Sequence, residues 1–518
     1  MRPIKFFFVF LIGLSLVFIK YFLFSNLSKN YNSDIYNYRA FSLINNGTDE
    51  HGFKLPLVFQ SRLGYEMPLN SYLYTTVFAL SQNTGISEYL YEILLLILLS
   101  VSIYSLSKSK WAIVLVSFCP YFLWPGNWTE KIFIPLVFFA IKFYRSKKLI
   151  LLAITSILLF LTSTVSLPLL IIYLLVITFQ KKHAKYWKFT LFMVIFTGIF
   201  IKLFLNLPYS KTFLISQNFN LLNNIEYKNA VNQLRGEDFN TTFQKVSRLL
   251  HNKTALLTSV LGYSIRTFDP SLWFFNGDKN IASNRQLIPL FLPLYILVLF
   301  FIPLRIKKIK KIFPYILIAA FFVGINGDIS QSKLLIILPF IILIIVECFK
   351  DINTFGKYII FISSLLIFFP MISISIDHRP QSIMAYSTQS TDAFYKIITL
   401  NQNKNIYITD EIYPDLGPQL SYMLKILPQK NTKKISEIYQ PYIRSISPKI
   451  EIISPDNPNL NIVDPKNINP DILNSLFFVS TTLYKEGGGK DFRNYVPVIY
   501  DRQNNPLIYQ LNYEIPKK

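Results

Sequence analysis

A cluster of acidic residues follows the first apolar run of the chain and is the group best suited to proton transfer. Asp34 comes first, and Asp49, Glu50 and His51 follow in the segment Gly47–Gly52. A carboxylate at the edge of a bilayer, where the headgroup of a lipid-linked molecule meets water, can take a proton from a hydroxyl. Asp34 is therefore a candidate general base, and an ordinary solvated loop aspartate is the alternative.

The composition predicts a multi-pass α-helical membrane protein. Of 518 residues 52% are hydrophobic and only 16% are charged, which is more apolar sequence than a soluble core needs. The formal charge of +23 comes from Lys and Arg residues in short links between apolar runs, and no nucleic-acid-binding motif accompanies them. Cys119 and Cys348 fall in or beside predicted spans, so we expect them to be small buried residues.

The number of spans depends on how one ambiguous run is interpreted. Residues 6–24 are long enough to cross the hydrocarbon, with no cleavage site after them, and predict an uncleaved first span. Residues 69–84 have helical spacing between Pro68 and Gly85 and fit either a span or an interfacial helix. If this helix lies flat outside, the span at about residues 89–106 ends inward at a basic link.

Every later basic link then falls on the cytoplasmic side. We therefore expect about eleven spans in the cytoplasmic membrane, a cytoplasmic N-terminus and a C-terminal region outside. The basic links contain Lys108, Lys110, Lys142, Arg145, Lys147, Lys148, Lys181, Lys182, Lys185, Lys188, Arg305, Lys307, Lys308, Lys310, Lys311, Lys350 and Lys357.

Two domains are predicted. Residues 1–376 form the membrane domain, with a first outer loop at 25–88 that carries interfacial helices and a large outer loop at 206–286. Residues 377–518 form a small extracytoplasmic α/β domain. Its predicted elements are a helix carrying Phe394, Ile397 and Ile398 after Thr391, strands at 406–409 and 476–480, and a hairpin of 496–500 with 507–511.

Two blocks of motifs follow the first span in a fixed order. The first runs from Asp34 through Tyr38 and Ala40, Gly47–Gly52 and Leu55-Pro56-Leu57 to Tyr65–Leu69. The second contains His251-Asn252-Lys253, Gly262-Tyr263 and Phe268–Asp278. In this order the motifs resemble the GT-C membrane glycosyltransferases, and most closely the bacterial relatives of protein O-mannosyltransferases and lipid A aminoarabinose transferases.

The resemblance implies transfer of a sugar from a polyprenyl-phosphate carrier to an acceptor glycan, lipid or protein outside the membrane. Asp34 takes the position of the family's catalytic base. Glu130 lies where the family places a second carboxylate, which can orient the acceptor or hold a divalent metal with Asp34. The alternative for Glu130 is a carboxylate stabilised by a helix N-terminus. No cofactor is certain, and metal dependence stays open.

Departures from the family pattern leave the phosphate-binding cation unassigned. Many relatives have Glu after the catalytic Asp, where this chain has Ile35, and Lys before the Pro-Leu pair, where it has Glu66-Met67. The cation must then come from elsewhere, and a solvated loop cation is the alternative for each candidate. The predicted substrate-binding residues are Arg39, Asp49, Glu50, His51, Arg62, Lys253, Arg266 and Arg285.

Two rival functions remain open. A transporter or flippase of lipid-linked sugars normally keeps ionisable groups at mid-membrane. Lys20, Glu92 and Lys202 instead lie near predicted span ends, where they can snorkel, which disfavours transport. A non-catalytic envelope scaffold is the other alternative, because the family residues at Ile35 and Glu66 are missing.

Overall fold

The fold is given by a computed structural model. It describes residues 33–61, 64–117, 119–123, 128–163, 195–196, 198–199, 202, 229, 231–233, 256–275, 290–327, 329, 331–363, 366, 394–409, 416–428, 445–453, 475–480, 493–500 and 506–513. The predicted first span at residues 6–24 and most of the loop at 206–286 lie outside this description.

The described residues belong to two compact units. One comprises Met1–Ser25, Glu66–Asn70 and Tyr91–Ser375, and the other Asn26–Tyr65, Ser71–Leu90 and Ile376–Lys518. The first outer loop therefore packs with the C-terminal region, which the sequence does not predict. Helices α3 (Pro68–Ser81) and α4 (Thr84–Ser107) each contribute residues to both units.

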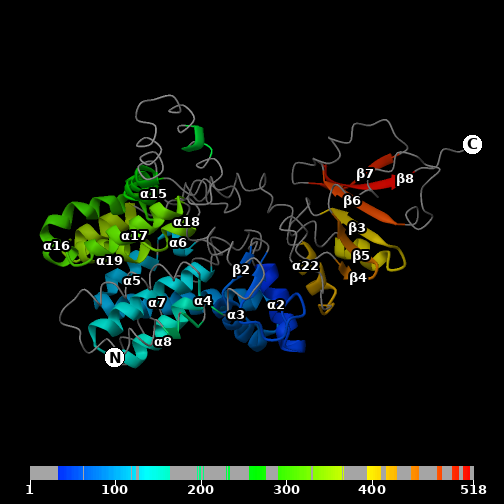
Figure 1. The fold of residues 1–518 in the computed structure, drawn as a ribbon, viewed down its shortest axis with the longest axis horizontal. Coiled ribbons are helices and arrows are strands. Elements are labelled where there is room, and N and C mark those ends of the chain that lie inside the picture. The colour runs from blue at the N-terminus through cyan, green and yellow to red at the C-terminus, as the bar shows by residue number, and fades with distance from the viewer. Residues whose placement is uncertain are drawn as a thin grey trace, which may run out of the picture. The chain divides into compact units, whose positions relative to one another are not determined.

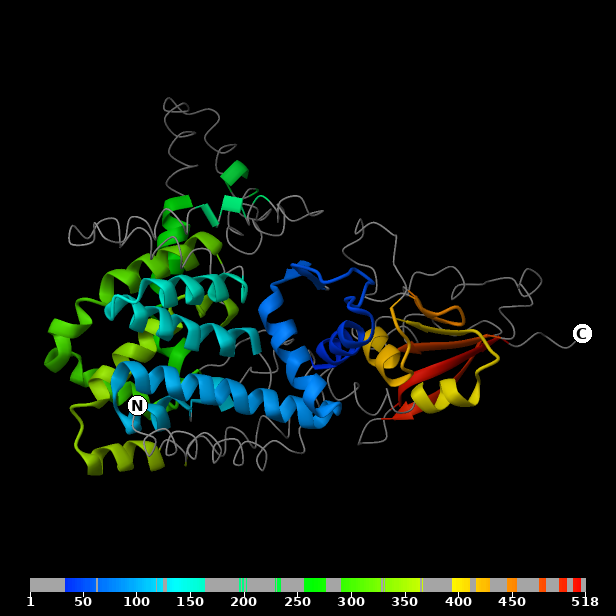
Figure 2. The same cartoon turned by 90° about the horizontal axis from the view of Figure 1, so that it is seen from below.

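The first unit is helical, and α19 (Leu338–Phe349) lies at its centre, packed against η3, α16, α17, α5 and α7. Helices α7 and α8 form a hairpin beside it (Figure 2). Cys119 and Cys348 are both fully buried, as predicted. The other elements are α5 (Lys110–Ser117), α6 (Pro120–Leu123), α7 (Trp128–Arg145), α8 (Leu149–Phe160), α15 (Pro270–Phe274), η3 (Pro293–Phe301), α16 (Ile302–Ile309), α17 (Phe313–Asn326) and α18 (Gln331–Leu334).

One described helix, α4, is long and apolar enough to cross a membrane, and a second span is formed if the broken pair Pro293–Ile309 and Phe313–Asn326, bent by 108°, counts as one. The apolar stretch after the predicted outer loop at 206–286 is a 3-10 helix, η3, followed directly by α16, and the helical stretch continues to Ile309. The total of about eleven spans stays a prediction.

The boundary between α3 and α4 differs from the predicted one. Gly85 was expected to end the first of these helices, but it lies inside α4. Helix α3 ends at Ser81, because Gln82 adopts the left-handed conformation with φ of 51°. Asn83 then caps α4, its Oδ1 accepting the N–H of Ile86 at 3.2 Å. The break therefore comes three residues before the glycine.

A six-stranded mixed sheet forms the core of the C-terminal region, in the order β4-β5-β3-β6-β8-β7 (Figure 1). Strand β3 pairs in parallel with β5 and β6, while β6, β8 and β7 pair antiparallel. The strands at 406–409 and 476–480 and the hairpin are confirmed. The bounds are β3 (Ile406–Thr409), β4 (Ser445–Ser447), β5 (Ile450–Ile453), β6 (Leu476–Ser480), β7 (Arg493–Tyr500) and β8 (Pro506–Tyr513).

Alternating side chains bury both faces of this sheet. Ile406, Ile408 and Phe478 face a cluster that includes Phe394 and Ile398 of the predicted helix, which is described from residue 394. Phe477, Val479 and Leu511 form the opposite cluster. Helix α22 (Leu416–Met423) contributes Leu420 to the first cluster, and α2 (Ser33–Asn46) packs against α22.

Candidate active site in the first outer loop

Helix α2 carries the predicted base in its first turn. The helix begins at Ser33 and ends where Gly47, with φ of 64°, donates its N–H to the carbonyl of Leu43 at 3.0 Å. An acidic residue in a first turn is favoured by the helix dipole, which suits Asp34 at this position. The side chain of Asp34 lies outside the described residues, so its role stays a prediction.

Arg39, two turns along α2, is held inside the protein by a buried carboxylate. Its Nε lies 3.0 and 2.8 Å from the two carboxylate oxygens of Glu50, and its Nη2 also donates to Glu50. Nη1 donates to Oγ of Ser71 at 2.6 Å, and the guanidinium lies 4.4 Å from the ring centroid of Phe59. A substrate phosphate would reach Arg39 only by displacing Glu50. We therefore interpret Arg39 as a residue that positions the loop.

The motif after α2 folds into a tight turn around Asp49. Its Oδ1 accepts the N–H groups of His51 at 2.9 Å and Phe53 at 2.8 Å, and its own N–H donates to the carbonyl of Phe53 at 2.9 Å. Gly52 has φ of 82°, which favours glycine. The sequence Asp-Glu-His-Gly therefore has a structural purpose: it turns the chain so that Glu50 points at Arg39.

Burial of this turn changes the acidity of its side chains. The pKa of Asp49 rises from 3.8 to about 6, first because the carboxyl is buried and then because Glu50 repels its charge, against the hydrogen bonds from Phe53 and His51 and the charge of Arg39. Burial lowers the pKa of His51, against the attraction of Glu50. The turn therefore contains one carboxyl that titrates close to neutrality.

A second polar chain leaves α2 one turn after Asp34. Asn37 is buried, its Oδ1 accepts the hydroxyl of Tyr74 on α3, and its Nδ2 donates to Oε1 of Glu88 on α4 at 3.2 Å. No sequence pattern predicts these contacts, because the three residues come from three helices and each is an ordinary polar residue alone. These contacts fix α2 against α3 and α4.

The third attachment of α2 is to the C-terminal sheet domain. Tyr38 is 2% exposed, belongs to the cluster formed by the sheet and α22, and hydrogen-bonds with Ser421. The ring of Phe41 packs edge-on against Tyr422 with centroids 5.8 Å apart. Nζ of Lys425 lies 3.8 Å from the Tyr422 centroid. Asn37, Tyr38 and Arg39 thus tie three successive positions of α2 to three different partners.

In the helical unit, the structure corrects the prediction for Glu92. It was expected to snorkel, but it is 6% exposed and lies 3.0 Å from Nζ of Lys131, which is also buried. Oε1 of Glu92 also accepts the indole N–H of Trp128 at 2.8 Å. This ion pair joins α4 to α7. Lys202, by contrast, is exposed, and Lys20 lies outside the described residues.

The remaining predicted residues are placed only in part. Glu130 lies in the first turn of α7, which begins at Trp128, and its side chain is not among those described. Arg266 is exposed at the end of a helical stretch, and Arg62, Lys253 and Arg285 lie outside the described residues. Within the described part of the chain no group of three His, Cys, Asp or Glu side chains could hold a metal.

No protein-family model and no curated protein matches the chain. Among solved structures, the chain is similar to the crystal structure of ArnT from Cupriavidus metallidurans bound to undecaprenyl phosphate, with 10% identity over 98% of both chains and a TM-score of 0.45. At this TM-score the match assigns no role to any residue.

Proposed function

We propose that this protein transfers a sugar from a polyprenyl-phosphate donor to an acceptor outside the cytoplasmic membrane, with Asp34 as the general base. Asp34 takes a proton from the acceptor hydroxyl, whose oxygen forms a bond to the anomeric carbon. The bond from that carbon to the phosphate oxygen breaks, and polyprenyl phosphate leaves with the electron pair. One well-placed base accelerates such a step roughly a hundred- to ten-thousandfold.

The observation that carries this proposal is the fixation of α2 immediately after Asp34. Asn37, Tyr38 and Arg39 are each buried and hydrogen-bonded to a different element. A catalytic group needs such support, because a displacement of about 1 Å can cost a hundredfold in rate. An ordinary solvated loop aspartate would need none of it.

The proposed phosphate site uses a cation other than Arg39. Arg39 already binds Glu50, so the candidates are Arg62, Lys253, Arg266 and Arg285. A guanidinium offers two parallel donors to a phosphate, which favours the three arginines. Glu130 is proposed to orient the acceptor, with a divalent metal between it and Asp34 as the alternative.

The test compares the full-length protein with Asp34→Asn in lipid vesicles. A panel of polyprenyl-phosphate hexoses, pentoses and aminopentoses is the donor set, and release of polyprenyl phosphate is measured with acceptor lipid or glycan present. Asp34→Asn should lose at least a hundredfold in turnover and keep its unfolding temperature. Glu451→Gln, a half-buried carboxylate of β5, serves as the control and should keep full turnover. Turnover that survives Asp34→Asn removes Asp34 from the mechanism.

One observation favours a second candidate, a transporter of lipid-linked sugars. Glu92, which pairs with the buried Lys131 of α7, lies on α4, the one described helix long enough to span the membrane by itself. Buried ionisable groups in spans often serve to couple transport to the movement of an ion or a proton. No turnover with any donor, together with movement of a fluorescent lipid-linked sugar across the vesicle membrane, would support this candidate. Absence of both activities would favour the scaffold.

A further inference from the structure

A pocket opens at one end of the helical unit, and none of the residues proposed above for sugar transfer lines it. It is lined by α4, α7 and α19 and by Ile312, which precedes α17. Seven of its ten lining residues are apolar, among them Phe138 and Leu343. The three polar ones are Ser107, Arg145 and Glu347. The pocket therefore has a mostly apolar lining that also carries two charged side chains, Arg145 and Glu347.

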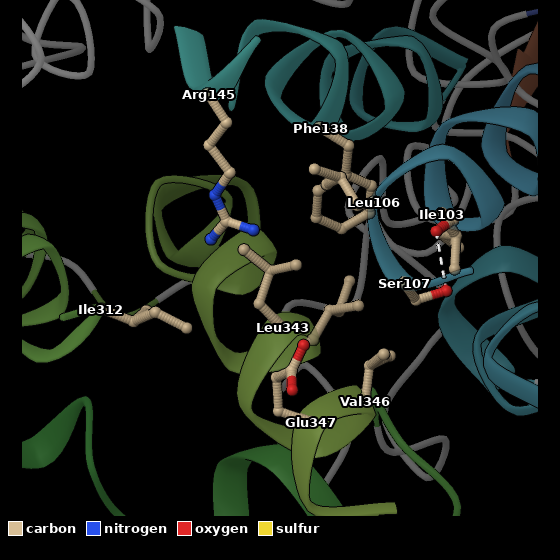
Figure 3. Close-up of a pocket in the computed structure, with 10 residues that line it drawn as sticks. Ile103, Leu106, Ser107, Phe138, Arg145, Ile312, Leu343, Val346 and Glu347 are labelled. Atoms are coloured by element: carbon tan, nitrogen blue, oxygen red, sulfur yellow. Dashed lines mark hydrogen bonds between the residues drawn. The ribbon is translucent and has the colours of Figure 1, made fainter. Parts of the chain in front are cut away.

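Arg145 supplies the cation of this pocket. It is the last residue of α7, it is exposed, and Figure 3 shows its guanidinium extending toward Leu343. None of the described carboxylates pairs with it. Glu347 is already neutralised, since its carboxylate lies 2.6 Å from Nζ of Lys350 and 3.5 Å from Nζ of Lys308. Arg145 is thus available to an anion, unlike Arg39.

The surroundings strengthen the positive potential. The lining helices α4, α7 and α19 end here, and α17 begins here, so four of the predicted basic links converge on one end of the unit. Arg305 is neutralised by Asp351 across two of these links and adds little to the potential. Further cations of these links include Lys108, Lys110, Lys142, Lys148, Lys307, Lys310 and Lys311.

We propose that this pocket binds an anionic glycerophospholipid of the inner leaflet, with the phosphate on Arg145 and the first carbons of an acyl chain against the apolar lining, because a cavity of about 20 Å³ holds no whole chain. Arginine matches a phosphate with two parallel donors, and basic pockets between helices at the cytoplasmic side suit acidic headgroups. A free phosphate would leave the apolar wall unused. The site is independent of the proposed sugar transfer and falls on the cytoplasmic side in the predicted topology.

Detergent-purified full-length protein is titrated with short-chain phosphatidylglycerol, short-chain phosphatidylcholine and glycerol phosphate. Binding is followed by native mass spectrometry and by the shift in unfolding temperature. Phosphatidylglycerol should bind at least tenfold more tightly than phosphatidylcholine, and glycerol phosphate should bind weakly. Arg145→Gln should weaken phosphatidylglycerol binding about ten- to a hundredfold, as expected for a charge-assisted contact.

Lys147→Gln is the matched control. Lys147 is an exposed cation two residues further on that does not line the pocket, so its loss should change affinity less than about twofold. Leu343→Trp, which fills the pocket, should weaken the binding of both phosphatidylglycerol and phosphatidylcholine. Equal effects of Arg145→Gln and Lys147→Gln would overturn the proposal, because they would indicate general charge attraction. Glycerol phosphate binding as tightly as the lipid would also overturn it.

Discussion

Nε and Nη2 of Arg39 both donate to the carboxylate of Glu50, and neither side chain is more than 1% exposed. The pair joins α2 to the turn that follows it, and Ser71 extends the contact to α3. A buried guanidinium with these partners holds structure together. The residues of the motif at 47–52 are therefore needed to form this turn and its ion pair, whether or not they also bind a substrate.

Breaking this pair should destabilise the protein. Arg39→Met leaves the Glu50 carboxylate buried without a counter charge, which costs about 3–5 kcal/mol of unfolding free energy. Adding Glu50→Gln should recover part of that loss. Thermal and denaturant unfolding measure both variants, and Arg266→Met, at an exposed site, should change stability by less than about 0.5 kcal/mol. A stable Arg39→Met with weakened donor binding would instead return Arg39 to the substrate site.

Asp49 should make stability depend on pH. Its pKa is raised from 3.8 to about 6, so the folded state holds the proton more tightly and this contribution to stability is lost as pH rises through about 6. Asp49→Asn keeps an oxygen for the N–H groups of His51 and Phe53. The variant should be more stable than the wild type at pH 7.5, by at most on the order of 3 kcal/mol, and nearly equal at pH 4.

The control for that prediction has the opposite sign. Asp269 caps α15 and accepts the N–H of Ser271 at 2.9 Å, and these hydrogen bonds lower its pKa. Asp269→Asn should therefore be less stable than the wild type at pH 7.5, and the difference between the two proteins should shrink at acid pH. Parallel behaviour of the two variants across the pH range would contradict the assignment for Asp49.

The contact between α2 and α22 should affect turnover under the proposed function. Tyr422→Ala removes the ring that packs on Phe41 and Phe78, so α2 should shift and turnover number should fall about tenfold or more, with a smaller change in KM. Tyr407→Ala is matched to it, because Tyr407 stacks on Phe477 at 4.9 Å on the opposite face of the sheet. Equal losses of turnover at equal stability would show that α2 is not positioned by this contact.

The Glu92–Lys131 pair separates the two candidate activities. If the pair is structural, the double variant Glu92→Gln with Lys131→Met should fold and keep sugar transfer, because it removes both buried charges together. A coupled transporter would lose its activity in the same variant. Parallel assays of transfer and of lipid-linked sugar movement in vesicles read out both. Loss of transfer alone would place the pair in the transfer mechanism.

Local sequence predicted four of the six strands of the sheet, and it missed β4, β5 and helix α22. Strands such as β3, with Ile406 and Ile408 buried on one side, carry their signal in β-branched residues at alternate positions. The segments at 406–409 and 476–480 match β3 and β6. The helix break near Gly85 was misplaced, because the capping of α4 by Asn83 decides it and the glycine does not.

The same sequence did not indicate which charged side chains would pair with one another. The snorkelling expected of Glu92 fails because Lys131 and Trp128 offer it a partner from another helix, which no periodicity records. Arg39 was predicted to bind phosphate, yet Glu50 lies within its reach once the turn at Gly52 closes. Pairings of this kind are decided by tertiary packing, and local pattern gives only the residue types.

The place of Tyr38 in the hydrophobic cluster of the sheet domain limits how the chain can be divided. Tyr38, with Ile35 and Phe41 beside it, completes a core whose other members come from residue 394 onward. A fragment cut at residue 377 would therefore present an unfilled apolar hollow and would tend to aggregate. Anyone isolating the C-terminal domain must supply α2 with it, as a fused or separately added helix.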